Sequence, residues 1–404
     1  MNNPNTYTTM KKYILTVCTV LLALLCTVAC GDGNQSSDKS AGSEPGKEAS
    51  AVTKTATKAK AKKAKKSRKS RKSRKSVFIP SSAGAPYEVL IVAGEDSFHS
   101  GAVDTLYNIM TDDVPGIAQS EPLFKVSRIN QSNFSKTLRL TRNVIIVKID
   151  PSTYSKCKIK FSRDVYASPQ IVMTIQAPSA FKFINFVKDN SEIITELFNR
   201  SELNRQCEIL KEDHQPVVEE QVQNIFGCDI YVPAELTKIK KARNFVWARC
   251  EKFVKRVEQH TNIVIYSYPY TDVNTFTKEY FVHKRDSVMK LHIPGPSEGK
   301  YMMTTMPFVI SSDEVVHGKY AQVVRGLWNV KDYDMGGPFV SVSRVDEKNQ
   351  RVVVAEAFIY YPNKEKRDPL RRLEAALYTL RLPDELDLEK FSFDLDEIVI
   401  TPED

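Results

Sequence analysis

The sequence contains neither a Cys-x-x-Cys motif nor a group of cysteines and histidines with the spacing of zinc ligands. Structural zinc sites need four such ligands close together, so we expect no structural metal and no other cofactor. Nucleotide-binding loops carry a glycine-rich fingerprint, which is also missing here. The apolar run at residues 13–28 is too short for a stable membrane span, because Gly31-Asp32-Gly33 ends it abruptly.

The N-terminal apolar run has the layout of a lipoprotein signal peptide. Lys11 and Lys12 precede it, and the small residues at its end are followed directly by Cys30. We therefore expect residues 1–29 to be removed and the Cys30 thiol to carry the lipid that anchors the protein in a membrane. An ordinary secretory signal cleaved after Ala29 is the alternative. Whether the chain starts at Met1 or at Met10 stays open.

A basic segment follows the signal peptide. Residues 31–76 contain 15 Lys and Arg against 4 Asp and Glu and show no apolar periodicity. Such a composition cannot offset the entropy of ordering, so we expect residues 30–76 to form a disordered tether. Anionic lipid head groups or lipopolysaccharide phosphates are counter-charges that it could contact. A solubilising spacer without a specific partner is the simpler interpretation.

The positive net charge of the whole chain comes from this segment. The chain carries a formal charge of +9, but residues 384–404 alone hold nine acidic residues and one lysine. We interpret residues 384–404 as an acidic C-terminal tail, in which Phe391, Phe393 and Leu395 alternate as in a half-buried edge strand. Because we expect export to the envelope, we expect no nucleic acid as partner.

Four cysteines remain after the signal peptide and the lipidated residue are set aside: Cys157, Cys207, Cys228 and Cys250. In an exported protein they allow three pairings, among which the sequence does not choose. All four could also stay reduced.

Between the tether and the tail, the pattern predicts an α+β fold with mixed or antiparallel sheets and packed helices. We expect a first half at residues 77–226 and a second at 227–383, and the two could be related. Strands are expected at residues 88–93, 123–129, 143–150, 158–165, 170–176, 229–232, 244–250, 262–268, 319–330, 339–345 and 351–361. Helices are expected near 103–110, from 179 to 226 with breaks at Asp189-Asn190 and Pro216, and at 274–290 and 367–380.

Several longer motifs resemble an uncharacterised lipoprotein family of anaerobic Gram-negative bacteria. They are FSRDVYASPQ (161–170), YSYPYTD (266–272), TFTKEYFVHKRD (275–286), DMGGPF (334–339) and QRVVVAE (350–356). The similarity spans residues 80–383. The family is known only as a domain of unknown function. The resemblance therefore implies a lipoprotein and carries over no catalytic residue.

Three polar residues on one predicted helix could form a metal-binding or catalytic site. Glu279, His283 and Asp286 are spaced i, i+4 and i+7 on one predicted helix, so their side chains share a face. They could bind a metal or supply an acid–base group, although a solvated face is the simpler interpretation. Ser179 and Lys182 match a Ser-x-x-Lys motif, but we expect Ser179 to be the N-cap of a helix.

Two further groups of residues lie on predicted strands. Tyr266, Tyr268 and Tyr270 alternate, and would stack on sugar rings if exposed or pack within the sheet if buried. Glu356 lies in a strongly apolar strand, where a carboxylate needs a partner or a raised pKa. Arg325 is our candidate partner in a buried ion pair, and a catalytic Glu356 is the alternative.

These observations predict a location more sharply than an activity. We expect a lipid-anchored cell-envelope protein, in the outer membrane and on its periplasmic or surface-facing side. A non-enzymatic binding or scaffold module for an unknown envelope partner is our main hypothesis. A hydrolase or transferase acting on envelope glycan or peptide is the alternative, and it would need a deep pocket with paired carboxylates or a Ser/His pair.

Overall fold

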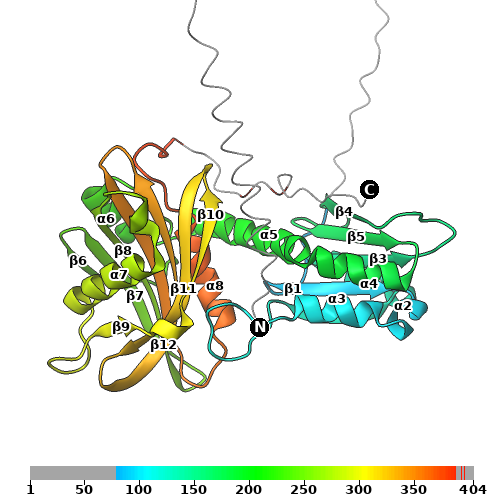
Figure 1. The fold of residues 1–404 in the computed structure, drawn as a ribbon, viewed down its shortest axis with the longest axis horizontal. Coiled ribbons are helices and arrows are strands. Elements are labelled where there is room, and N and C mark those ends of the chain that lie inside the picture. Colours follow the sequence, from blue (N-terminus) through cyan, green and yellow to red (C-terminus); the bar gives the residue numbers. More distant parts are fainter. Residues whose placement is uncertain (1–78, 388–392, 394, 396–404) are drawn as a thin grey trace, which may run out of the picture. The chain divides into compact units, whose positions relative to one another are not determined.

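The computed structural model describes residues 79–387, 393 and 395, and these form an α+β fold with two separate sheets (Figure 1). The strands are β1 (Glu88–Ala93), β2 (Lys125–Asn130), β3 (Asn143–Ile149), β4 (Lys158–Arg163), β5 (Ile171–Ala177), β6 (Lys238–Ala242), β7 (Phe245–Val254), β8 (Val257–Pro269), β9 (Met302–Thr304), β10 (Ile310–Val316), β11 (Lys319–Val330), β12 (Tyr333–Asp346) and β13 (Arg351–Tyr360). The α-helices are α2 (Glu95–His99), α3 (Ala102–Met110), α4 (Ala180–Asp189), α5 (Ser191–Glu212), α6 (Pro216–Phe226), α7 (Lys278–His292) and α8 (Arg367–Leu377).

The first sheet has the strand order β2-β1-β3-β5-β4. Its first four strands are parallel, and only β4 at the edge is antiparallel to β5. Helices α3 and α4 and the first half of α5 cover one face, where Ile91, Ile145 and Met173 are fully or almost fully buried. The opposite face is smaller and packs against Phe134 of the segment between β2 and β3. Parallel strands buried on both faces explain the nearly continuous apolar runs of β1 and β3.

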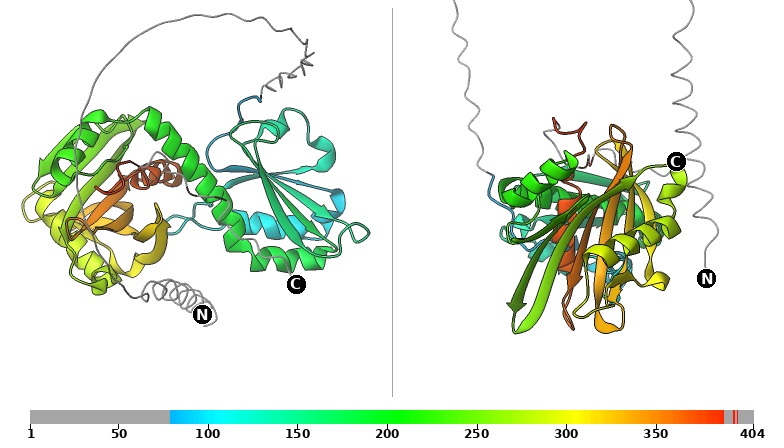
Figure 2. Two further views of the ribbon diagram at one scale, coloured as in Figure 1. Left: turned by 90° about the horizontal axis from the view of Figure 1, so that it is seen from above. Right: turned by 90° about the vertical axis from the view of Figure 1, so that its left-hand side faces the viewer.

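The second sheet is antiparallel throughout and follows the order β10-β11-β12-β13-β8-β7-β6, with β9 paired to β11. Helix α7 lies on one face, while α6 and α8 lie on the other, around which the sheet curls (Figure 2). Because neighbouring residues of a strand face opposite ways, each central strand serves two cores. In β13, for example, Val353 belongs to the α8 side and Val354 to the α7 side.

Helix α5 takes part in the cores of both sheets. Ile194 and Phe198 in its first half pack on the first sheet, whereas Leu203 and Cys207 in its second half pack on the second. At about 100° per residue, Ile194 and Leu203 point in opposite directions from the helix axis. The buried face of α5 therefore changes half-way along the helix. As a result, the sequence of α5 lacks the single amphipathic period of a helix that packs on one core.

A buried ionic cluster fixes α5 at this change of face. The fully buried carboxylate of Glu202 contacts Arg205 at 2.6 Å and Arg142 at 2.9 Å. Asn143, at the start of β3, donates to Glu202 at 2.7 Å and to the backbone oxygen of Glu88 at 2.9 Å. Two cations and one amide thus compensate the carboxylate and join α5 to β1 and β3.

Glu121, which precedes β2 of the first sheet, caps helix α8, which packs on the second sheet. The carboxylate of Glu121 accepts hydrogen bonds from the backbone N–H groups of Lys366 and Arg367, at 2.8 and 2.7 Å. These donors belong to the first turn of α8, where a helix has no internal acceptors and favours negative charge. The side chain of Arg367 in turn donates to the Pro122 carbonyl at 2.7 Å. The start of α8 is therefore held by residues about 245 positions earlier.

The sequence-based elements agree with the structure in most places. Residues 88–93 and 319–330 form the strands expected, and the predicted breaks near residue 190 and at Pro216 separate α4, α5 and α6. The strand expected at residues 229–232 was wrong, because only one isolated bridge forms there, between Asp229 and Arg381. Strands β6, β9 and β10 were missed.

The idea of two related halves is not supported. The first sheet is mostly parallel and the second is antiparallel, and their strand orders differ.

The thiols of Cys207, Cys228 and Cys250 are free, so none of the three complete disulfide pairings forms. Among the described residues, no helix is long and apolar enough to cross a membrane. Residues 1–78, with the predicted signal peptide, Cys30 and the whole predicted tether, lie outside the described residues, as does Phe391.

Candidate functional site

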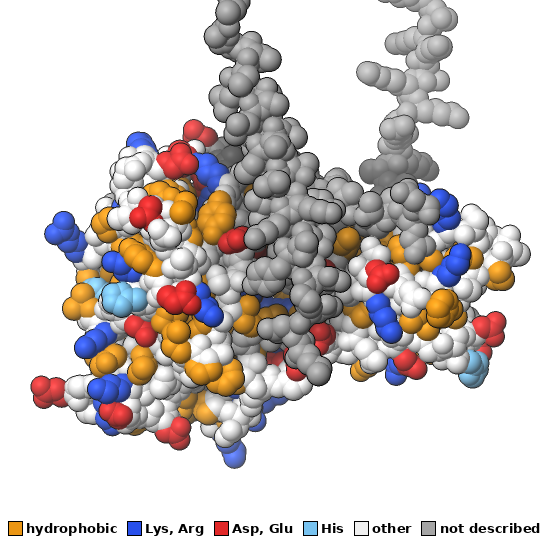
Figure 3. Space-filling view, in the orientation of Figure 1, with side chains coloured by type: hydrophobic (Ala, Val, Ile, Leu, Met, Phe, Trp, Pro, Cys, Tyr) orange, Lys and Arg blue, Asp and Glu red, His pale blue; other side chains and the backbone are white. Residues whose placement is uncertain are grey.

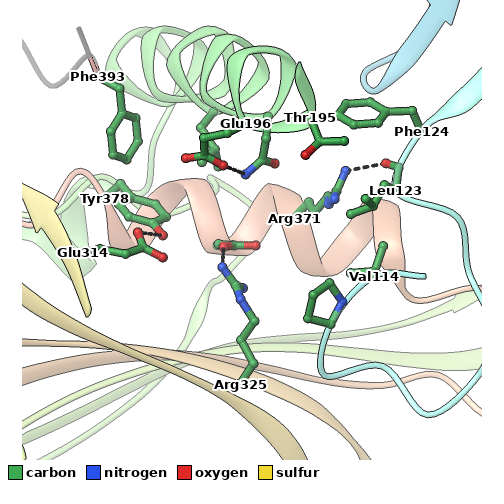
Figure 4. Close-up of a pocket in the computed structure, with 14 residues that line it drawn as sticks. Val114, Leu123, Phe124, Thr195, Glu196, Glu314, Arg325, Arg371, Tyr378 and Phe393 are labelled. Atoms are coloured by element: carbon green, nitrogen blue, oxygen red, sulfur yellow. Dashed lines mark hydrogen bonds and ion pairs between the residues drawn. The ribbon is translucent and has the colours of Figure 1, made fainter. Parts of the chain in front are cut away.

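A pocket of about 260 Å³ lies where α5 and α8 face each other, with β10 and β11 on one side and the segment before β2 on the other (Figure 4). We call it the junction pocket. It is lined by Val114, Pro115, Leu123, Phe124, Thr195, Glu196, Asn199, Leu203, Glu314, Arg325, Arg371, Glu374, Tyr378 and Phe393. Three carboxylates and two guanidinium groups face a space that is otherwise apolar, and such a concentration of ionisable side chains is typical of functional sites.

An ion pair spans the floor of the junction pocket. Arg325 of β11 donates to Glu374 of α8 at 2.6 Å, and both side chains are largely buried. Burial alone would lower the pKa of Arg325, but the neighbouring Glu374 raises it above its ordinary value. Both groups are therefore charged, and each has its charge compensated by the other.

A second acid has no cation within hydrogen-bonding distance among the described residues. The half-buried Glu314 of β10 accepts a hydrogen bond of 2.9 Å from the hydroxyl group of Tyr378. Burial raises the pKa of Glu314, although Arg325 works in the opposite direction. Burial and the nearby carboxylates Glu314 and Glu374 also raise the pKa of Tyr378. Glu314 therefore offers an acceptor that a bound cation could still neutralise.

The other wall of the pocket lies between α8 and the segment that precedes β2. Arg371 donates to the backbone oxygen of Leu123 at 2.7 Å, and its guanidinium lies 4.1 Å from the ring centre of Tyr87. Burial lowers the pKa of Arg371. Arg371 thus connects α8 with the residues just before β1 and β2 through one hydrogen bond and a ring contact.

Helix α5 and one residue after α8 cover the pocket. Glu196 of α5 is paired with Arg200 at 2.6 Å, and Asn199 lies beside it. Phe393 packs edge-on against Tyr378 at 5.1 Å, and its backbone groups exchange two hydrogen bonds with Asn204. The aromatic ring thus closes one end of the space that Figure 4 shows.

The structure places the predicted helical stripe on the outside of α7. Glu279 and His283 are exposed, on a face where charged side chains lie among hydrophobic ones (Figure 3). Asp286 is half-buried and accepts hydrogen bonds from both the backbone and the hydroxyl group of Thr304, at 2.9 and 2.6 Å. It therefore ties α7 to β9. Within the described part of the chain, no three His, Cys, Asp or Glu side chains gather as metal ligands.

The alternating tyrosines belong mainly to the core. Tyr266 and Tyr268 are 1% and 7% exposed and pack beneath α7, whereas Tyr270 is half-buried at the end of the strand. They pack within the sheet, as the second interpretation of their spacing expected. Ser179 accepts a hydrogen bond from the backbone of Lys182 at 3.3 Å, which confirms its interpretation as an N-cap.

Glu356 forms a buried ion pair, but not with the expected partner. Arg285 of α7 binds its carboxylate with two nitrogens, at 2.8 and 2.9 Å, and Ser341 donates at 2.9 Å. Arg285 and Glu356 are both fully buried. Burial raises the pKa of Glu356, which Arg285 and Ser341 oppose. This pair joins α7 to the middle of the second sheet.

Arg325 could not be the partner because of strand register. Glu356 lies opposite Ser341, and Ser341 lies opposite Val324, so Glu356 shares its face with residue 324. Arg325, one position further along β11, points to the other face, where it meets Glu374. A shift of one residue thus separates the structural ion pair below α7 from the junction pocket.

Sequence reasoning identified Arg325 but missed the rest of the junction pocket. Glu314 lies in a polar edge strand without an apolar period. Glu374 lies in an amphipathic helix, where a single acidic residue is common and does not indicate a site. Their proximity depends on how β10 and α8 pack. Local spacing contains no information of that kind.

Two matches to family models cover most of the described chain. Residues 215–379 match a domain of unknown function (DUF4837), and residues 82–211 match a second domain of unknown function (DUF8532). The resemblance to uncharacterised families of unknown function is thereby confirmed. A comparison with curated proteins gives no match. Both matched regions contribute side chains to the junction pocket.

We predict that Glu356→Gln lowers the free energy of unfolding by about 3–5 kcal/mol, because it leaves Arg285 buried without a carboxylate. Urea unfolding at pH 7 measures the change. The double variant Arg285→Met with Glu356→Leu should recover much of the loss, since it removes both charges. A single variant as stable as the parent would contradict the structural role of this pair.

We predict that Glu314→Gln changes how stability depends on pH. A carboxyl group whose pKa is raised on folding favours the folded state while it is protonated, and this contribution is lost as pH rises through the folded-state pKa. From about pH 4.5 upward, the parent should therefore lose stability relative to Glu314→Gln. Urea unfolding between pH 4 and pH 8 tests this. The exposed Glu279→Gln is the matched control and should give a constant difference.

Proposed function

We propose that this protein is a lipid-anchored protein of the cell envelope that binds a small ligand carrying a protonated amine in the junction pocket. The expected binding residue is Glu314, through its carboxyl group. It faces the pocket, accepts one hydrogen bond from Tyr378, and has a pKa that burial raises. A bound ammonium group would provide the opposite charge that this site lacks.

The other charges of the junction pocket favour a cation over an anion. Glu374 is paired with Arg325, and Arg371 is bound to the Leu123 carbonyl and to aromatic rings. Three carboxylates nevertheless face the pocket against two guanidinium groups, so the lining as a whole carries an excess of negative charge. The apolar part of the wall, including Phe124 and Phe393, suits the hydrocarbon part of a small amine.

The anchoring part of the proposal rests on the sequence. Lys11 and Lys12, the apolar run and Cys30 follow the order of a lipoprotein signal. A diacylated or triacylated cysteine would hold the folded residues at a membrane surface, for which we propose the outer membrane. The basic segment before residue 77 would then lie next to anionic head groups.

A hydrolase or transferase remains the second candidate. Glu314 and Glu374 are two carboxyl groups in one pocket, and Glu314 has the raised pKa that a general acid needs. The engagement of Glu374 with Arg325 argues against it. Among the described residues that line the pocket, there is also no serine, cysteine or histidine to act as a nucleophile or base.

We predict that putrescine or lysine raises the melting temperature of the parent and that succinate does not. The carboxylate of Glu314 should attract the ammonium group, and the effect should grow as pH rises through the raised pKa of Glu314. Glu314→Gln should reduce the shift at least fivefold, which differential scanning fluorimetry would detect.

The matched control is again Glu279→Gln, which should respond like the parent. Equal shifts in parent and Glu314→Gln would contradict binding at this carboxylate. Release of a product from envelope glycan or peptide by the parent, lost in Glu314→Gln, would favour the enzyme instead.

We predict that Cys30→Ser abolishes incorporation of labelled palmitate and moves the protein from the membrane fraction to the soluble fraction. Only the Cys30 thiol lies at the end of the apolar run in the position that is acylated. Fractionation and autoradiography of cells measure both effects. Cys26→Ser, within the apolar run, is the control and should leave labelling and membrane association unchanged. Palmitate labelling that survives Cys30→Ser would overturn the anchor.

A further inference from the structure

A second pocket lies on the α7 side of the antiparallel sheet, beyond the C-terminal end of that helix. Its volume is about 350 Å³, within the range of small-molecule sites, and it shares no lining residue with the junction pocket. We call it the aromatic pocket. It is lined by Trp247, Arg249, Glu251, Glu258, His260, Asn262, Ile293, Pro294, Gly295, Pro296, Met302, Trp328, Val330, Tyr333, Met335, Phe358 and Tyr360.

The pocket exists because α7 covers only part of this sheet face. The helix ends at His292, and the chain then turns along the pocket edge through Pro294 and Pro296. Beyond the helix, the pairing of β7, β8 and β13 brings Glu251, His260 and Tyr360 into one row. The strands thus present polar and aromatic side chains on a face that no helix covers.

Both tryptophans of the chain form the floor. Trp247 and Trp328 are 9% and 3% exposed, and Trp328 packs edge-on against Phe358 at 5.4 Å. Trp328 lies over Gly337, where an added Cβ would be 3.3 Å from the indole nitrogen and 2.0 Å from the Ile359 oxygen. A glycine is therefore required at position 337 by the close approach of the Ile359 carbonyl, and it also leaves room for the indole ring.

The polar groups of the floor are unequally satisfied. The indole N–H of Trp247 donates to the side-chain oxygen of Asn262 at 3.0 Å, and Asn262 donates to the Phe358 carbonyl at 3.4 Å. The indole N–H of Trp328 has no hydrogen-bond partner among the described residues. This nitrogen is itself buried and lies next to the backbone at Gly337, so the hydrogen-bonding groups that a ligand can reach are those of the rim.

The rim supplies further hydrogen-bonding groups, and its charges are balanced. Arg249 lies over the Trp247 ring at 4.5 Å and contacts Glu251 at 3.1 Å, and Glu251 is also paired with Lys238. Glu258 contacts His260 at 2.8 Å, and Lys300 lies over the Tyr333 ring at 5.0 Å. An ionic ligand therefore gains no net attraction at the rim, whereas the carboxylates offer acceptors to hydroxyl groups.

Two tyrosines complete the mouth. Tyr333 is 48% exposed, and the half-buried Tyr360 has its ring 5.5 Å from that of His260. The negative faces of such rings attract the C–H groups of a sugar ring, whose hydroxyl groups remain at its edge. Apolar faces beside several donors and acceptors fit a pyranose better than an acyl chain, which would leave the polar groups unpaired.

From this arrangement we propose that the aromatic pocket binds a neutral sugar ring of a glycan. The ring packs against Tyr360 and Tyr333, and its hydroxyl groups donate to Glu251 and Glu258. The proposal is independent of amine binding in the junction pocket, because the two pockets have no residue in common.

The two tryptophans make a direct experiment available, because both lie in the pocket and no other tryptophan contributes to the fluorescence. We would titrate the full chain with glucose, galactose, mannose, N-acetylglucosamine and cellobiose, and with glucuronate as an anionic probe. At least one neutral sugar should change the emission in a saturable way, and glucuronate should bind more weakly.

Variants locate the site. Tyr333→Ala should weaken binding about tenfold, in line with the loss of a well-placed aromatic contact. The matched control is Tyr320→Ala, since Tyr320 is 44% exposed but lies outside the pocket. Circular dichroism and thermal unfolding check that each variant folds.

The proposal is overturned if none of the neutral sugars gives a saturable change, or if Tyr333→Ala and Tyr320→Ala bind equally well. Saturable binding of decanol without binding of any sugar would also overturn it and would assign the pocket to an acyl chain.

Discussion

The buried carboxylate of Glu202 is the interaction on which the arrangement of the described chain depends. It lies where α5 passes from the core of the first sheet to the core of the second, and an ion there is tolerated only if it is compensated. Arg142, Arg205 and Asn143 provide this compensation from both α5 and the start of β3. The cluster sets the position of α5 along its axis and about it, and so determines which residues face each sheet.

The junction pocket follows from that constraint. Once α5 is fixed, its exposed turn at Glu196 lies across from α8, whose first turn is held by Glu121. Side chains from two matched regions of unknown function then meet around one space, and neither region alone would form it. Rigid helices on both sides keep Glu314 and Tyr378 in place without a ligand, which favours selective binding of a small molecule.

The two pockets differ in chemistry because they differ in the elements that form them. The junction pocket is bounded by helices and carries ionisable groups whose charges depend on one another. The aromatic pocket is a bare part of a sheet face, where alternation along the strands brings Trp247, Asn262 and Phe358 to the same side. For a protein held at the envelope surface, these would be separate means of recognising a small cation and a glycan.

By itself, the sequence predicted a signal peptide and a basic tether, and it determined the α+β class and most of the strands and helices, because each follows from neighbouring residues or from a short period. It also indicated that Glu356 needs a partner. Only the tertiary structure decided that the partner is Arg285 rather than Arg325, since this depends on the register of β11, β12 and β13. The same holds for both pockets. Their residues are far apart in the chain, and only the packing of whole elements brings them together, which no local pattern records.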